Sequence, residues 1–168
     1  HQAFLLWRDK AAQERAGWMF KLAEVLRRNG EEYASLMSRE MGKPIGEARG
    51  EVEKCAWLSE FYGANAAGWL QDEAVEADGL KHRVVYQPVG VVLSVMPWNY
   101  PFWQALRFAV PTLAAGNTSI LKHASNVTGC ALAIEDAFKQ AGFPANVFRT
   151  IVTDHRTVAE VIARDEIQ

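Results

Sequence analysis

Three apolar runs separated by helical stretches constrain the fold of this chain most strongly. They are VGVVLSVM (residues 89–96), TSILK (118–122) and NVFRTIV (146–152), and all are rich in apolar and β-branched residues. Runs of this kind are typical of strands buried on both faces of a parallel sheet. Helical patterns over residues 101–115 and 128–141 separate the runs. We therefore predict an α/β fold with right-handed strand–helix–strand crossovers.

The residues before the first apolar run have helical periodicity, with apolar side chains at three- and four-residue steps. We predict helices up to residue 28, over residues 31–41, and from residue 45 to about residue 67. Gly30 is predicted to be the C-terminal cap of the first of these helices. Glu51 and its charged neighbours on the third helix are expected to lie mostly in solvent.

The chain is predicted to have three parts. Residues 1–75 form a helical part, residues 76–87 a strand segment, and residues 88–168 the first part of a Rossmann-like sheet domain. A turn-rich break, DEAVEADG (72–79), is predicted before the strand LKHRVVYQ (80–87). The chain opens inside a helical pattern and closes on what resembles the start of a strand, so we expect it to be a piece of a longer protein.

Charge and composition exclude several classes of partner. The formal net charge is −2 over 168 residues, so no global charge attracts nucleic acid or an anionic membrane. Arg107 interrupts the longest apolar region, and no run reaches membrane-spanning length. The two cysteines, Cys55 and Cys130, lie far apart without metal-ligand spacing. This cysteine usage is typical of a reducing compartment, so we expect a cytoplasmic protein with no metal site.

The usual nucleotide-binding signatures do not occur. No G-x-G-x-x-G follows a predicted strand, and no G-x-x-x-x-G-K-[ST] is present, which argues against a standard Rossmann dehydrogenase or a P-loop enzyme. A ligand is still expected at the carboxyl ends of the parallel strands. The first strand leads into MPWNYP (96–101) and the second into LKHAS (121–125). We expect these two strand ends to be adjacent and to form one wall of a crevice.

The polar residues at these strand ends have simple structural explanations. From the residues alone, Asn99 is best explained as the N-cap of a helix that begins at Pro101. Lys122 follows a buried strand, and its ammonium group could reach solvent along the strand end. A structural ion pair with an acidic residue elsewhere would explain Arg107.

Several linked motifs resemble the aldehyde dehydrogenase superfamily. They are PWNYP (97–101), AAGNTSILKHAS (114–125), AGFPANVF (141–148) and, in the helical part, EMGKPIGEARGEV (40–52). The resemblance covers essentially the whole chain. Within the family, NYPFWQALRF and LKHAS look closest to bacterial NAD(P)-dependent succinate-semialdehyde dehydrogenases. The resemblance implies oxidation of a small aldehyde to the acid with NAD or NADP, by a homo-oligomer that is a dimer or a tetramer.

On the reacting side, the resemblance implies that the amide of Asn99 donates to the oxygen that becomes an anion during oxidation. Trp103, Gln104 and Arg107 share one face of a helix and would line the aldehyde tunnel. The Arg107 guanidinium would bind the distal carboxylate of a short aldehyde such as succinate semialdehyde in a two-pronged contact.

On the cofactor side, the resemblance implies that Lys122 donates hydrogen bonds to the adenosine ribose hydroxyls. Ser125 stands where many family members have a glutamate. Without a carboxylate to repel a 2′-phosphate, NADP should be tolerated, alongside NAD. Four residues at the end of the first strand would line the cofactor cleft, although a role in the sheet core would also explain them: Val95, Met96, Pro97 and Trp98.

The resemblance also implies what this chain does not contain. The cysteine motif F-x-N-x-G-Q-x-C and the glutamate motif E-L-G-G are absent, so we expect the chain alone to be inactive and the catalytic domain to lie elsewhere. Cys55 and Cys130 are expected to be inert helix-face residues. The histidines are expected on the surface. The strand LKHRVVYQ resembles a segment that binds a second subunit.

Two other classes of function remain open. The chain could be a non-catalytic nucleotide-binding or dimerising module, or a truncated product without function. The intact mass of the natural protein separates the enzyme from both. Titration of NAD+ and NADP+ against tryptophan fluorescence separates the binding module from the inert product, because Trp98 should report an occupied cleft.

Overall fold

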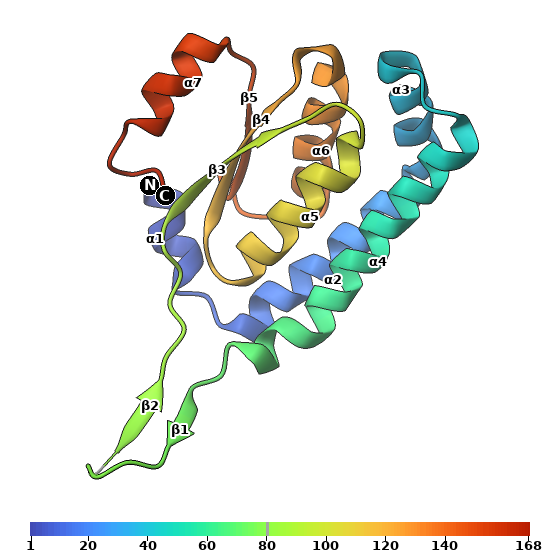
Figure 1. The fold of residues 1–168 in the computed structure, drawn as a ribbon. Coiled ribbons are helices and arrows are strands. Elements are labelled where there is room, and N and C mark those ends of the chain that lie inside the picture. The colour runs from blue at the N-terminus through green and yellow to red at the C-terminus, as the bar shows by residue number, and fades with distance from the viewer. Residues whose placement is uncertain (80) are drawn as a thin grey trace.

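A parallel sheet with helices packed against one face, and a hairpin arm that projects from this body, make up the structure (Figure 1). It is a computed structural model that describes residues 1–79 and 81–168. The elements in chain order are α1 (Gln2–Arg8), α2 (Ala12–Arg28), α3 (Gly30–Met41), α4 (Ile45–Trp69), β1 (Glu73–Val75), β2 (His82–Val84), β3 (Val91–Met96), α5 (Pro101–Ala114), β4 (Thr118–His123), the 3-10 turn η1 (Ser125–Val127), α6 (Thr128–Gln140), β5 (Phe148–Ile151) and α7 (His155–Ile162).

The three apolar runs form the central sheet, in the order β3–β4–β5 with all strands parallel. In the first pair, Val91 lies opposite Thr118 at one end and Met96 lies opposite His123 at the other. This confirms the predicted α/β fold. Because the strands are parallel and adjacent, their carboxyl ends meet at one edge of the sheet.

The helices α5 and α6 cover one face of this sheet, and α2, α3 and α4 pack behind them (Figure 1). The core lies between these layers, because the apolar residues of the helices and of one sheet face interdigitate there. Its largest fully buried side chains include Trp7, Met19, Leu106, Leu121 and Phe138. The opposite sheet face is less covered, and Val95 on β3 is 55% exposed. The prediction of burial on both faces is therefore wrong for this part of β3.

The last two residues of the chain also bond to β3. Ile167 forms a parallel bridge with Val91, and the N–H of Gln168 donates to the Val91 carbonyl at 2.9 Å. Since β4 occupies one edge of β3, this bridge lies on the other edge. The strand order therefore reverses at β3, which makes its carboxyl end a topological switch point, the usual ligand position in open parallel sheets.

Two local predictions in the helical part are wrong. Gly30 is the first residue of α3, not a C-terminal cap, because α2 ends at Arg28 and Asn29 is both the C-cap of α2 and the N-cap of α3. Glu51 is buried, at 5% exposure. By contrast, Gly42 ends α3 in the left-handed conformation, with φ of 75°, which glycine adopts without a steric penalty.

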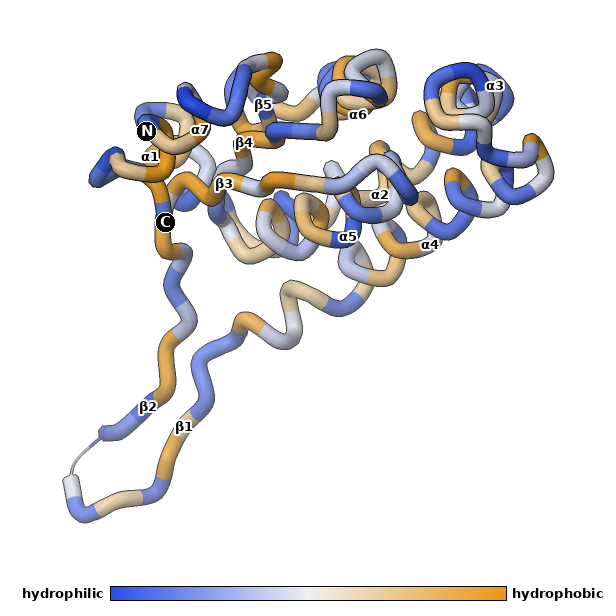
Figure 2. The backbone as a smooth tube through the Cα atoms, turned by 45° about the horizontal axis from the view of Figure 1, so that its top comes forward, coloured by the Kyte–Doolittle hydropathy of each residue, from blue (hydrophilic) through white to orange (hydrophobic). Residues whose placement is uncertain are grey.

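The hairpin arm formed by β1 and β2 projects away from the body (Figure 2). The two strands pair antiparallel, with Ala74 opposite Arg83. The prediction of a turn-rich break over residues 72–79 missed β1, because a strand of this length has too little pattern to separate it from a turn. The strand prediction over residues 80–87 is confirmed at His82–Val84, while Leu80 lies outside the described residues.

Candidate functional site

The site is built where β3 and β4 end side by side. Val95 lies opposite Lys122 in the parallel register, and Met96 lies opposite His123. Paired residues in a parallel sheet point to the same face. Val95 and Lys122 therefore lie on the face away from α5, while His123 faces α5, where its Nε2 is 2.9 Å from the Pro101 carbonyl oxygen. The predicted adjacency of the two strand ends is confirmed.

Asn99 lies in the short loop between β3 and α5, and it is exposed, as are Trp98 and Tyr100 on either side. It does not cap the helix. The N-cap of α5 is Tyr100, which makes no side-chain capping bond. The structural explanation of Asn99 as an N-cap is therefore wrong.

The cap of α5 comes from a distant residue. Glu51 Oε1, on α4, accepts hydrogen bonds from the backbone N–H groups of Phe102 and Trp103, each at 2.9 Å. The next helix is capped in the same way. Glu40, on α3, accepts from the N–H groups of Gly129 and Cys130 at 2.7 and 2.8 Å. Both carboxylates lie within the motif EMGKPIGEARGEV, but the local pattern gave no sign of this use.

These caps restrict how a dinucleotide could bind. The N-terminus of a helix that follows a parallel strand is the usual site for a pyrophosphate. At α5 and α6 the N–H groups of the first turn already hold protein carboxylates, which also neutralise the positive end of each helix dipole. A phosphate cannot replace these carboxylates without loss of their hydrogen bonds. The missing glycine-rich signature and the occupied helix ends therefore both argue against a pyrophosphate at the N-terminus of α5 or α6.

Lys122 is a charged group at this edge that no described residue neutralises. It is 7% exposed, and its ammonium group has no hydrogen-bond or ion-pair partner among residues 1–79 and 81–168. Within the same residues, Ser119 Oγ is the one fully enclosed side-chain polar atom without a partner, so the Lys122 ammonium group keeps an opening to solvent. A mostly buried ammonium group with such an opening is suited to donate to the hydroxyl or phosphate oxygens of a ligand.

Ser125 lies two residues beyond β4, at the start of η1, and it is exposed. It lines a small pocket at the carboxyl ends of β4 and β5, together with Ile151 and Thr153. Of the residues predicted to line the cofactor cleft, Val95, Pro97 and Trp98 are exposed and Met96 is half-buried. These side chains are available to a ligand.

The predicted substrate residues lie on the outer side of α5. Trp103 and Gln104 are half-buried, and Arg107 is exposed. The residues between them, such as Leu106, face the core. Among the ion pairs of the described residues, Arg107 takes part in none, so nothing in this part of the structure supports its explanation as a structural ion pair.

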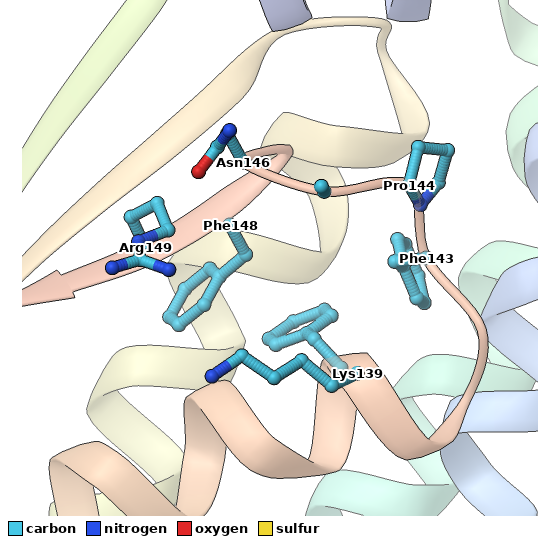
Figure 3. Close-up of a pocket in the computed structure, with 8 residues that line it drawn as sticks. Lys139, Phe143, Pro144, Asn146, Phe148 and Arg149 are labelled. Carbon is cyan, nitrogen blue, oxygen red and sulfur yellow. The ribbon is translucent and has the colours of Figure 1, made fainter.

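A second pocket lies at the amino-terminal end of β5, between this strand and the end of α6 (Figure 3). Lys139 and Arg149 line it. Both cations already pair with Glu135, at 2.9 and 3.1 Å, and the pocket is at the wrong end of the strand for a ligand in this type of sheet. We do not assign a function to it.

The cysteines do not form part of a reactive site. Both are buried, and burial raises the pKa of the Cys55 and Cys130 thiols. Glu40 beside Cys130 raises the pKa of that thiol further. Neither thiol is prepared to become a thiolate nucleophile. Among the described residues, no three His, Cys, Asp or Glu side chains are grouped as metal ligands would be, and no helix is apolar enough over a sufficient length to cross a membrane.

His123 is buried, so its prediction as a surface residue is wrong. Its Nδ1 accepts from the N–H of Ala124 at 3.0 Å, and its Nε2–H therefore donates to the Pro101 carbonyl at 2.9 Å. The imidazole ties the end of β4 to the start of α5. Burial lowers the pKa of His123 below its ordinary value of 6.5, against the opposing effect of its backbone hydrogen bonds.

This lowered pKa predicts a loss of stability in mild acid. The unfolded chain takes up a proton on His123 at a higher pH than the folded chain does, so stability falls as the pH drops below 6.5. A His123→Gln variant cannot titrate but keeps an amide for the Pro101 carbonyl. We expect its Tm to fall less than that of the unchanged protein between about pH 7.5 and about pH 5.5. Parallel Tm curves for the two proteins would contradict the assignment.

Known proteins resemble this chain over almost its full length. Residues 1–167 match the aldehyde dehydrogenase family. A probable NADP(+) succinate-semialdehyde dehydrogenase of Synechocystis is 46% identical over 167 residues, which cover 99% of this chain and 37% of the relative. The NAD(P)+ succinate semialdehyde dehydrogenase Sad of Escherichia coli is 40% identical over 161 residues, covering 96% of this chain and 35% of the relative.

The solved structures include succinic semialdehyde dehydrogenase from Streptococcus pyogenes in complex with NADP+. It superposes with a TM-score of 0.95 at 33% identity, over 99% of this chain and 37% of that chain. The present chain therefore spans little more than a third of the length of the relatives that it matches.

Proposed function

The chain belongs to the aldehyde dehydrogenase family, and we propose that the whole protein containing it oxidises succinate semialdehyde to the dicarboxylate with NAD+ or NADP+. The observation that carries the proposal is the shared edge of β3 and β4. There, the exposed amide of Asn99 follows one strand and caps no helix. The buried ammonium group of Lys122 ends the adjacent strand and has no partner among residues 1–79 and 81–168. Both lie at the topological switch point.

The role of this chain in the reaction is to bind and to stabilise charge. A cysteine supplied by another part of the protein would add to the aldehyde carbon, and the carbonyl oxygen would become an anion. The Asn99 amide donates to that oxygen, which is stabilised more in the transition state than in the ground state. When bound, NAD(P)+ supplies the acceptor for the hydride. Because Cys55 and Cys130 are buried and unactivated, residues 1–168 alone should be inactive.

The cofactor is held on this chain through its adenosine half. Lys122 donates to the ribose hydroxyls, and Val95 and Trp98 provide apolar surface beside it. Ser125 carries no charge, so a 2′-phosphate meets no carboxylate at this position. The relatives support use of both cofactors, since one is named for NADP(+) and another for NAD(P)+. Because Glu51 and Glu40 occupy the first-turn N–H groups of α5 and α6, these two helix ends would not hold the phosphates.

The hairpin arm contributes to a subunit interface in this proposal. All residues of β1 and β2 are exposed, and β-branched and aromatic side chains, among them Val75, Val84 and Tyr86, lie uncovered on it. An exposed two-stranded arm is only marginally stable by itself, and its open edge favours pairing with another chain. We propose a second copy of the protein as the partner, in a dimer or a tetramer.

Arg107 sets the preference for a substrate with a carboxylate. In the whole protein, an Arg107→Ala variant should raise the KM for succinate semialdehyde by about tenfold to a hundredfold, because a charge-assisted two-pronged contact is lost. The KM for butanal, an uncharged aldehyde of the same length, should stay unchanged. Both constants are measured from the absorbance of the reduced cofactor. Equal losses on the two aldehydes would reject this role, and no oxidation of either by the unchanged protein would reject the proposed function.

A further inference from the structure

The loop that contains Asn99 is held by a buried ion pair from the helical part of the chain. Lys43, in the link between α3 and α4, pairs with Glu51 on α4, and their side chains are 5% and 2% exposed. Glu51 uses one carboxylate oxygen for this ion pair and the other for the N–H groups of Phe102 and Trp103. The pair is therefore joined directly to the first turn of α5.

The same lysine also contacts the residue that follows Asn99. The Lys43 ammonium nitrogen lies 3.8 Å from the centroid of the Tyr100 ring, which is cation–π distance. On the other side of the loop, the Met96 carbonyl accepts from the N–H of Ala124 at 3.0 Å. Asn99 is thus the exposed part of a short segment fixed at both ends, by β4 before it and by Lys43 and Glu51 after it.

A helix N-terminus does not need such an arrangement for stability alone. A Ser, Asp or Asn at the N-cap would satisfy the first-turn N–H groups locally. Here the N-cap is Tyr100, without a capping bond, and the acceptor comes from a helix that precedes it by about fifty residues. Buried ion pairs are often no more stabilising than apolar pairs of the same volume, and specificity of geometry is one reason to keep them. As a result, the position of the Asn99 loop is fixed relative to α4.

We propose that Lys43 and Glu51 are positioning residues that set the place of the Asn99 amide for catalysis. The inference rests on the proposed function, since it concerns the same amide. A displacement of a catalytic group by about 1 Å can lower a rate by about a hundredfold. The pair therefore affects turnover through Asn99, without touching substrate or cofactor itself.

A double-mutant cycle in the whole protein tests whether Lys43 and Glu51 act through the Asn99 amide. Glu51→Gln keeps an oxygen for the two N–H groups but removes the ion pair with Lys43. We expect it to lower kcat for succinate semialdehyde by at least about tenfold, with the KM for NADP+ unchanged. In an Asn99→Ala background, the same substitution should change kcat by less than about twofold, because the amide that it positions is gone.

The matched control is Glu31→Gln, which removes a carboxylate from an exposed ion pair between Glu31 on α3 and Arg49 on α4. This control should keep the kcat of the unchanged protein. If Glu51→Gln does not fold, Tyr100→Leu takes its place in the cycle. This substitution removes the contact between Lys43 and the loop but leaves the buried Lys43–Glu51 pair intact, and Tyr100 is exposed. Tyr100→Phe keeps the ring above Lys43 and should rescue turnover.

Two results overturn the inference, and they differ in what else they reject. Equal penalties in the two backgrounds would mean that the pair acts on stability or on another step, and would leave the proposed function standing. An Asn99→Ala variant as active as the unchanged protein would reject both this inference and the proposed use of Asn99.

Discussion

An Asn99→Ala variant of the whole protein should lose about a hundredfold to a thousandfold in kcat for succinate semialdehyde, the usual effect of removing one oxyanion donor. The Kd for NADP+ should not change, because the amide acts on the aldehyde oxygen. The Tm should not change either, since Glu51, and not Asn99, accepts the hydrogen bonds of the first-turn N–H groups of α5. Steady-state kinetics, cofactor titration and thermal unfolding measure these three quantities.

The matched control for this variant is Asn65→Ala, at a half-buried asparagine of α4 whose amide N–H donates to the Phe61 carbonyl. It should keep full activity. If Asn99→Ala instead lowered the Tm and left kcat within about tenfold of the unchanged protein, the residue would be structural and its role as an oxyanion donor would be rejected.

A Lys122→Met variant should separate cofactor affinity from stability. Loss of charge-assisted hydrogen bonds to the ribose predicts a Kd for NADP+ and NAD+ about tenfold to a hundredfold higher. The cofactor-free protein should be no less stable, because Lys122 has no partner among the described residues and methionine fills the same volume without a charge to desolvate. Cofactor titration by tryptophan fluorescence and the Tm without cofactor test the two halves of this prediction.

Lys21→Met, at an exposed lysine of α2, is the control for a general effect of lost positive charge. A lower Tm together with an unchanged Kd in the Lys122 variant would show that the ammonium group serves the fold and would contradict its assignment to the cofactor.

The sheet and its functional edge could be predicted because they depend on short-range patterns. The three apolar runs form β3, β4 and β5. The ends of β3 and β4 are adjacent because a strand–helix–strand crossover usually joins neighbouring parallel strands. A glycine in the left-handed region ended α3 where Gly42 occurs in the sequence. The family resemblance supplied the chemical roles of Asn99 and Lys122, which no local pattern contains.

The errors at Asn99, Glu51 and His123 share a physical cause, which is that contacts with residues far away in the chain replaced local ones. Local rules predicted Asn99 as the N-cap of α5, but Glu51, about fifty residues earlier in the chain, accepts the hydrogen bonds of the first-turn N–H groups. Helical periodicity predicted that Glu51 faces solvent. It is buried instead, because it pairs with Lys43 and accepts hydrogen bonds from α5. His123 was expected on the surface, yet it binds backbone on both sides. Phe102 and Trp103 for Glu51, and Pro101 for His123, lie more than twenty residues away, so local patterns could not predict these contacts.

The most direct test of the account is a crystal structure of the whole protein with bound NADP+. We predict the adenosine ribose hydrogen-bonded to Lys122 Nζ on the face of the sheet away from α5, and the Asn99 amide directed toward the reacting carbonyl. A cofactor bound on the opposite face, or with its phosphates at the N-terminus of α5 in place of Glu51, would contradict it.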